Sequence, residues 1–391
     1  MEIQEKRSTG EMLKMPRDCA RSLQRTHNVR YKGDLLKESF LLWLTDYFTT
    51  ILRGKHPFPE YDLSDPRAGI HVMPNSVTIG LAGDWASGTV SAYRVRYEME
   101  ELDPDITIHL GDVYFAGKQE EFDEYFVGED DWPRGSLRTT DEINALPSYA
   151  LNGNHEMYSG GHAYFHSIKK HFGQETSFFC LENEHWRVVA LDSGYSSRLI
   201  PVLELIPWWI HLHDHNMKWL KENILGTDDP RPIILLSHHQ WFSSFDLEYN
   251  RFGRELGNDP RYLLWFWGHE HRLAAYGKHQ THPNGPSTRA RCIGHGGMPI
   301  EDIQTPVKRE RNLVAHDRRS SGNVDGTEVG YCGFAFLEFE DEALVISYRD
   351  ETGMNLLTER WLRTEDGARG EVLHHEPDLL TLERPIEELV A

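Results

Sequence analysis

The 391-residue chain has 39% hydrophobic and 26% charged residues, the composition of a globular protein with room for a large core. Acidic residues outnumber basic ones by 62 to 41, and the formal charge of −21 argues against nucleic acid polymers as partners. The N-terminus has no apolar signal segment, and no apolar stretch is long enough to cross a bilayer. We therefore expect a cytoplasmic protein without a membrane partner.

The sequence pattern divides the chain into three parts. Residues 1–75 contain one strong helical candidate, Leu35 to Arg53, and predict an N-terminal helical extension or cap. From Ser76 onward, short apolar runs alternate with helical patterns, which predicts an α/β domain over residues 76–365 with much parallel pairing. The charged residues 366–391 are expected to form a C-terminal tail. The expected strands are Val77–Ala82, Ile106–Leu110, Ser148–Leu151, Val188–Leu191, Ile233–Leu236 and Tyr262–Trp267.

A small polar cluster follows five of these apolar runs. In parallel sheets, ligands bind beyond the carboxyl ends of the strands, so we expect the clusters to converge. Their oxygen and nitrogen donors suit hard or borderline cations. Two adjacent cations activate water and neutralise a phosphoester, so the pattern predicts a dinuclear phosphoester hydrolase acting on a small phosphorylated substrate. The clusters are Gly83-Asp84-Trp85, Gly111-Asp112-Val113-Tyr114, Gly153-Asn154-His155-Glu156, Ser237-His238-His239 and Gly268-His269-Glu270-His271.

In this order the clusters resemble the motif series of the calcineurin-like metallophosphoesterases. The resemblance runs from Asp84 to His271, roughly half of the chain, and its most specific part is G-N-H-E followed by a strand-terminal His and G-H-x-H. It implies an α/β fold, a four-layer αββα sandwich of two mixed sheets packed face to face with helices outside. It also implies hydrolysis by attack of a metal-bridging hydroxide on phosphorus.

The first motif departs from the usual D-x-H of that superfamily, because Ala86 stands where the His ligand would be. The G-D-W form instead resembles the purple acid phosphatase branch, which supplies a tyrosinate three residues after the second Asp. At that spacing this chain has Phe115, with Tyr114 one residue earlier. The resemblance thus leaves open whether Tyr114 replaces the missing ligand.

The resemblance assigns the remaining ligands to two ions, which the mixed donors allow to be Fe, Mn or Zn. Asp112 would bridge the ions. The first ion would be bound by Asp84, Asp112 and His271, with Tyr114 as a substitute ligand, and the second by Asn154, His238 and His269.

Three further residues, His155, Glu156 and His295, are expected near the reaction. His155 would act on the substrate as the catalytic residue that stabilises phosphoryl oxygens or protonates the leaving oxygen, with Glu156 orienting it. His239, by contrast, is expected to be structural and to point away from His238, because neighbours on an extended segment face opposite sides. His295, in a Gly-rich run, is a candidate for substrate binding.

Two alternatives to a phosphomonoesterase stay open at this point. The same metal pair would serve a diesterase that acts on cyclic nucleotides or other diesters. A regulatory binding protein with a degenerate metal site is the second alternative, and Ala86 and Phe115 are its support. The sequence leaves the natural substrate and the oligomeric state open.

Overall fold

A computed structural model describes most of the chain after residue 53. The helix expected at Leu35 to Arg53 lies outside the described residues. Within the described part, no helix is long and apolar enough to span a membrane. The described residues are 54–128, 131–197, 209–280, 282–298, 306–308, 311–324 and 327–391.

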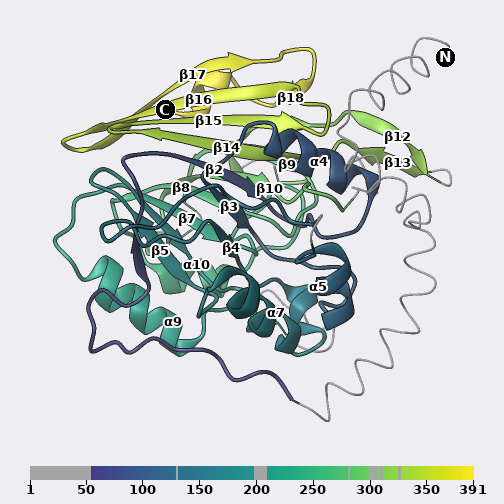
Figure 1. Cartoon of the computed structure of the whole chain (residues 1–391). Coiled ribbons are helices and arrows are strands. Elements are labelled where there is room, and N and C mark those ends of the chain that lie inside the picture. Colours follow the sequence, from purple (N-terminus) through teal and green to yellow (C-terminus); the bar gives the residue numbers. More distant parts are fainter. Residues whose placement is uncertain are drawn as a thin grey trace.

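A seven-stranded mixed sheet contains the first three of the strands predicted from the sequence (Figure 1). Its three strands β2, β3 and β4 pair in parallel, and the other neighbours pair antiparallel. In sheet order the strands are β17 (Gly367–His375), β16 (Asn355–Thr364), β15 (Ala343–Asp350), β14 (Gly333–Glu340), β2 (Ser76–Ala82), β3 (Ile106–His109) and β4 (Ser148–Ala150).

A nine-stranded mixed sheet lies against the first. Its centre, β6-β7-β8-β10, is parallel, as expected from the alternating strands and helices. In sheet order the strands are β1 (Ile70–Val72), β5 (Phe179–Glu182), β6 (Arg187–Ala190), β7 (Ile233–Ser237), β8 (Tyr262–Trp267), β10 (Thr288–Ile293), β9 (Leu273–His279), β11 (Leu313–Asp317) and β18 (Leu380–Leu382). A separate hairpin pairs β12 (Ser320–Val324) with β13 (Thr327–Gly330).

The main core lies between the two sheets. Side chains at alternate positions face it, such as Ile79 and Leu81 of β2, which are fully buried together with Ile234 and Leu236 of β7. Such alternation explains why one strand serves both this core and the helix-covered outer face. The sheets therefore pack face to face, in the αββα arrangement expected from the sequence.

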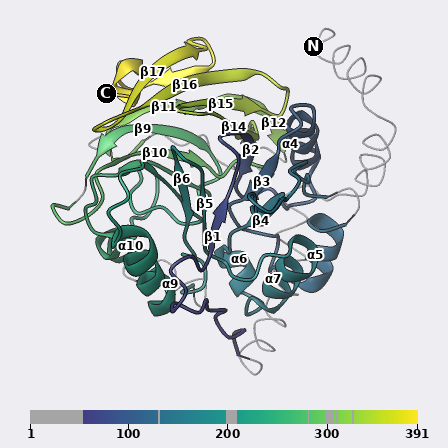
Figure 2. The same cartoon turned by 60° about the vertical axis from the view of Figure 1, so that its left-hand side comes forward.

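Helices cover the outer faces of both sheets (Figure 2). The helix α4 begins where the Thr89 side chain accepts a hydrogen bond from the Ala92 N–H, a typical N-cap. Helices α4 (Val90–Glu100), α5 (Gln119–Tyr125) and α7 (His162–Ser167), continued by η1 (Ile168–Phe172), pack on the seven-stranded sheet. Helices α9 (Asp214–Trp219), continued by η2 (Leu220–Leu225), and α10 (Asn250–Leu256) pack on the nine-stranded sheet.

The two ends of the described chain are built into the sheets. Among residues 54–75, which the sequence assigned to the extension, β1 pairs with β5. Residues 366–391, the expected tail, form β17 and β18 and the short helix η4 (Ile386–Leu389). Leu389 is fully buried in the main core, so this segment contributes to the packing of the domain.

Candidate metal centre

The five polar clusters lie at the carboxyl ends of strands from both sheets. Asp84 and Asp112 follow the parallel strands β2 and β3, and Asn154 opens α6 (Asn154–Met157) after β4. His238 and His269 follow the parallel strands β7 and β8 of the other sheet. Because the sheets pack face to face, all five loops meet at one edge of the sandwich.

The glycines before the ligands make this convergence sterically feasible. A Cβ atom on Gly268 would lie 2.6 Å from Asp84 Oδ2, and one on Gly153 would lie 2.2 Å from Asp112 Oδ1. Asp84 and Asp112 themselves have positive φ angles of 58° and 73°, which Asp tolerates better than most residues. The G-D, G-N and G-H pairs thus reflect the close approach of several loops.

One group of side chains surrounds the Tyr114 hydroxyl. Its oxygen lies 2.8 Å from Asp84 Oδ1, 2.8 Å from His271 Nε2 and 3.3 Å from Asp112 Oδ2. Burial and the charge of Asp84 raise the pKa of Tyr114 well above its usual range. The phenol is therefore protonated in the absence of a cation, and a cation at this point would favour its ionised form.

A second group surrounds the Asn154 amide. Its Oδ1 lies 2.9 Å from His238 Nε2 and 3.0 Å from His269 Nδ1, while Asp112 Oδ1 lies 3.4 Å from His238 Nε2. His238 Nδ1 donates to the Leu110 carbonyl at 2.9 Å, which directs Nε2 toward the group.

The electrostatics of this second group fit a bound cation. Burial disfavours charge on His238, but the neighbouring Asp112 carboxylate outweighs it and raises the pKa of His238 to about 10. Without a cation the pair holds a proton, and a cation would replace that proton. Asp84, Asp112 and His238 each offer one ligand atom within 4.8 Å of the others. The residues present therefore fit the metal centre that the sequence predicts.

His155 lies beside this centre. Its backbone N–H donates to Asp112 Oδ1 at 3.0 Å, and its Nε2 lies 3.8 Å from Asp112 Oδ2. Its Nδ1 donates to the Phe115 carbonyl at 2.7 Å, so this carbonyl orients the ring.

Glu156 has a different role from the one expected. Its carboxylate accepts hydrogen bonds from the backbone N–H groups of Asp112 at 3.2 Å, Val113 at 3.0 Å and Gly153 at 2.9 Å. It therefore joins the loop that carries Asp112 to the loop that carries Asn154.

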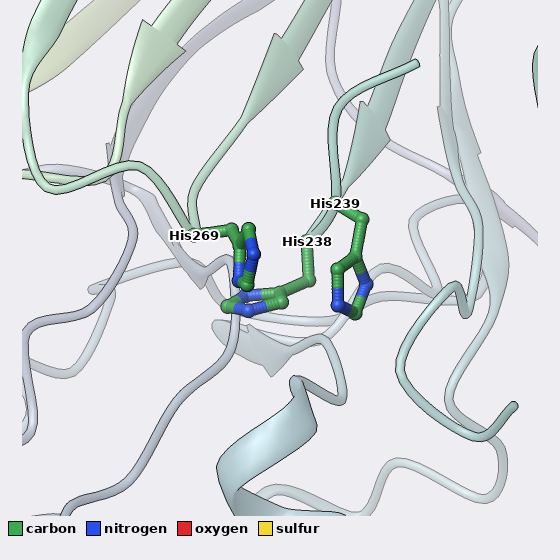
Figure 3. Close-up of side chains that lie close together, drawn as sticks. All are labelled: His238, His239 and His269. Carbon is green, nitrogen blue, oxygen red and sulfur yellow. The ribbon is translucent and has the colours of Figure 1, made fainter. Parts of the chain in front are cut away.

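His239 does not point away from His238 as expected. The strand β7 ends at Ser237, so the alternation of an extended strand no longer applies at the next two residues. The ring centroids of His238 and His239 are 4.8 Å apart, and that of His269 is 4.6 Å from His239. Figure 3 shows the three rings gathered at the ends of β7 and β8.

The glycines on either side of His295 lie against Gly83 and Asp84, but among the described residues no hydrogen bond or ion pair joins its side chain to the other predicted residues. Its side chain is 2% exposed, and burial lowers its pKa to about 4, with Asp317 and Asp350 nearby. Its carbonyl accepts a hydrogen bond from the Gly333 N–H at the start of β14. This buried ring is not open to a substrate.

Two tyrosines that the sequence did not single out contact the ligand candidates. The Tyr158 hydroxyl lies 2.9 Å from Asn154 Nδ2, and the Tyr249 hydroxyl lies 3.4 Å from His269 Nε2. The i to i+4 spacing from Asn154 on a helix could have indicated the first contact. Tyr249 lies on a distant loop, and no sequence pattern indicates its contact.

Comparison with known proteins places this geometry in a family. The calcineurin-like phosphoesterase family matches residues 77–273, which span half of the chain and all five clusters. No curated protein sequence gives a significant match.

Three solved structures are among those that the chain resembles. The purple acid phosphatase PPD1 from yellow lupin (Lupinus luteus) seeds has 15% sequence identity and a TM-score of 0.50, and the alignment covers 78% of this chain and 58% of that one. PhoD has 12% identity and a TM-score of 0.45, with coverage of 80% and 74%. A 5'-nucleotidase precursor from Thermus thermophilus has 13% identity and a TM-score of 0.30, with coverage of 78% and 55%. With its two sheets, its strand-end clusters and the match over residues 77–273, the chain belongs to the calcineurin-like phosphoesterase family.

Proposed function

We propose that the protein is a metal-dependent phosphoesterase that binds two cations, of Fe, Mn or Zn, and hydrolyses a small phosphorylated substrate. The observation that carries this proposal is the position of the Asp112 carboxylate. Its Oδ2 lies 3.3 Å from the Tyr114 hydroxyl in the first group, and its Oδ1 lies 3.4 Å from His238 Nε2 in the second. One carboxylate with an oxygen in each group suits a bridge between two cations.

The two groups differ in their proposed ligands. Asp84, Tyr114 and His271 would hold the first cation together with Asp112, and Asn154, His238 and His269 would hold the second. Bound cations of this kind lower the pKa of water and neutralise the charge on phosphoryl oxygens.

His155 supplies the proton in this proposal. The Phe115 carbonyl accepts the hydrogen bond from Nδ1, so Nε2 is the nitrogen that gains and releases a proton, and it can donate one only when the ring is in its doubly protonated form. This Nε2 faces the Asp112 side of the centre at 3.8 Å, where it can donate a proton to the leaving oxygen of an ester. The His155 side chain is 15% exposed, whereas that of Asp112 is 2% exposed, so His155 is the more accessible of the two to a substrate.

The alternative of a degenerate binding protein is less well supported by this geometry. Its basis was the absence of ligands at Ala86 and Phe115. The Tyr114 hydroxyl lies within 2.8 Å of both Asp84 and His271, where a replacement ligand for the first cation is needed.

The test is hydrolysis of an aryl phosphate monoester and a diester with added Mn, Fe or Zn. We expect Asn154→Ala to abolish turnover and His155→Ala to lower it by about 10²–10⁴-fold, the usual contribution of a general acid. His316→Ala, at a buried histidine of β11 that contacts Glu383, is the control for the removal of a buried imidazole. Full activity in both Asn154→Ala and His155→Ala would refute the mechanism, and the two rates separate monoesterase from diesterase activity.

A further inference from the structure

An additional imidazole lies beside the second group of ligands. His239 is fully buried, and its Nε2 has no hydrogen-bond partner among the described residues. One ring nitrogen from each of His238, His239 and His269 lies within 4.8 Å of the other two. A buried nitrogen that faces two other imidazole nitrogens without a partner leaves a polar group unsatisfied unless something binds it.

The orientation of the His239 ring is fixed from its other side. Ser193 Oγ lies 3.1 Å from His239 Nδ1 and also accepts the His239 backbone N–H at 2.9 Å. In Figure 3 the ring stands beside those of His238 and His269. Metal-binding histidines are commonly held in this way, with one ring nitrogen bonded to a neighbouring oxygen and the other directed at the ion.

We propose that His239 binds the second cation through Nε2, in addition to Asn154, His238 and His269. This inference rests on the proposed function, because it needs a cation at that position. It requires that Nδ1 carries the ring proton and donates it to Ser193 Oγ, which has two lone pairs and so can accept both this bond and the backbone N–H.

The additional ligand would make the two cation positions chemically different. The first has two carboxylates, a phenol and one imidazole, whereas the second has three imidazoles with an amide and the shared Asp112 carboxylate. Imidazole favours Zn and other late transition metals, and carboxylates favour Mn and Mg. We therefore expect the second position to select Zn over Mn.

Calorimetric titration of the metal-free protein with Zn²⁺ and with Mn²⁺ tests this inference. The wild type is expected to bind two Zn²⁺ ions, and His239→Ala to weaken one of them by at least ~10-fold, with a smaller effect on Mn²⁺. His316→Ala is the matched control, since it also removes a buried imidazole but lies on β11. Unchanged Zn²⁺ affinity in His239→Ala, or an equal loss in both variants, would overturn the inference.

A second measurement uses the unaltered protein, in case His239→Ala fails to fold. With ¹¹³Cd²⁺ bound and histidine labelled with ¹⁵N, His239 Nε2 should show coupling to cadmium and Nδ1 should carry the proton. A proton on Nε2 would contradict the inference, because that nitrogen would then be a donor. Absence of any bound cation in the wild type would instead refute the proposed function itself, so the two failures are distinguishable.

Discussion

Glu156→Gln tests whether one side chain joins the two loops that carry Asp112 and Asn154. The Glu156 side chain is fully buried and accepts three backbone N–H groups, those of Asp112 and Gly153 at Oε2 and that of Val113 at Oε1. In Gln, the amide oxygen can keep the two bonds at the Oε2 position. The NH₂ group then faces the Val113 N–H, which loses its acceptor.

The expected cost follows from that single unpaired donor. A buried N–H without a partner costs about 1–3 kcal/mol, so we expect the free energy of unfolding to fall by that amount. Because the strain falls on the Asp112 loop, we also expect metal affinity to fall by about 10–100-fold, as for other groups that position ligands. Glu156→Ala would remove all three hydrogen bonds and is expected to prevent stable folding.

Denaturant unfolding of the metal-free protein, hydrogen exchange and calorimetric metal titration together measure these effects. Exchange should accelerate at residues 112–114 and 153–156 and stay unchanged in β14 and β15. Asp350→Asn, which alters another buried carboxylate that accepts backbone N–H groups, those of Thr352 and Met354, is the control outside the five polar clusters. If Glu156→Gln left unfolding, exchange and metal affinity at wild-type values, the three hydrogen bonds would not hold the site together.

Three other changes have definite expected outcomes. Tyr114→Phe should remove a visible tyrosinate-to-iron absorption band from the iron-loaded protein. It should also lower the affinity for the first cation by about 10–100-fold. An active, iron-loaded wild type without that band would exclude Tyr114 as a ligand. Glu359→Ala should lower the free energy of unfolding by about 3–5 kcal/mol, because it leaves the buried Arg291 guanidinium without its carboxylate partner. In the wild type the guanidinium lies 2.6 Å from Glu359 Oε2. A loss below ~1 kcal/mol in denaturant unfolding would contradict this. Burial raises the pKa of Asp192 from its ordinary 3.8 to about 6, so the folded state holds the proton more tightly than the unfolded state, and stability falls by about 3 kcal/mol as pH rises between those values. Asp192→Asn should flatten that part of the stability curve, and an unchanged pH dependence in unfolding experiments would show that Asp192 does not titrate there.

The bounds of the strands that precede the polar clusters were predicted most accurately. The apolar runs that end at Ala82 and Trp267 correspond to β2 and β8, because each run is buried on both faces and stops at a Gly that must accommodate a neighbouring loop. The edge strand β17 was not predicted, and its residues fell in the expected tail. Its residues 367–375 are half-buried or exposed, so the pattern contains little apolar signal.

The grouping of the candidate ligands was predictable where it depends on residue type and order, and less so where it depends on backbone contacts. Asp112 and Asn154 both lie beside His238, and Asn154 lies beside His269, so Asp112, Asn154 and His269 lie together as expected. The role of Glu156 depends on three backbone N–H groups, which have no sequence signature. The expectation for His239 applied the alternation of a strand to residues beyond the last residue of β7, Ser237, where the alternation no longer holds.

The position of the cations tests the central claim most directly. Anomalous diffraction from crystals of the full-length protein loaded with zinc or manganese would locate each ion relative to the side chains. The account predicts two ions about 3.5–4 Å apart, with the Asp112 carboxylate between them. A single ion, or two ions bound away from Asp112, would contradict it.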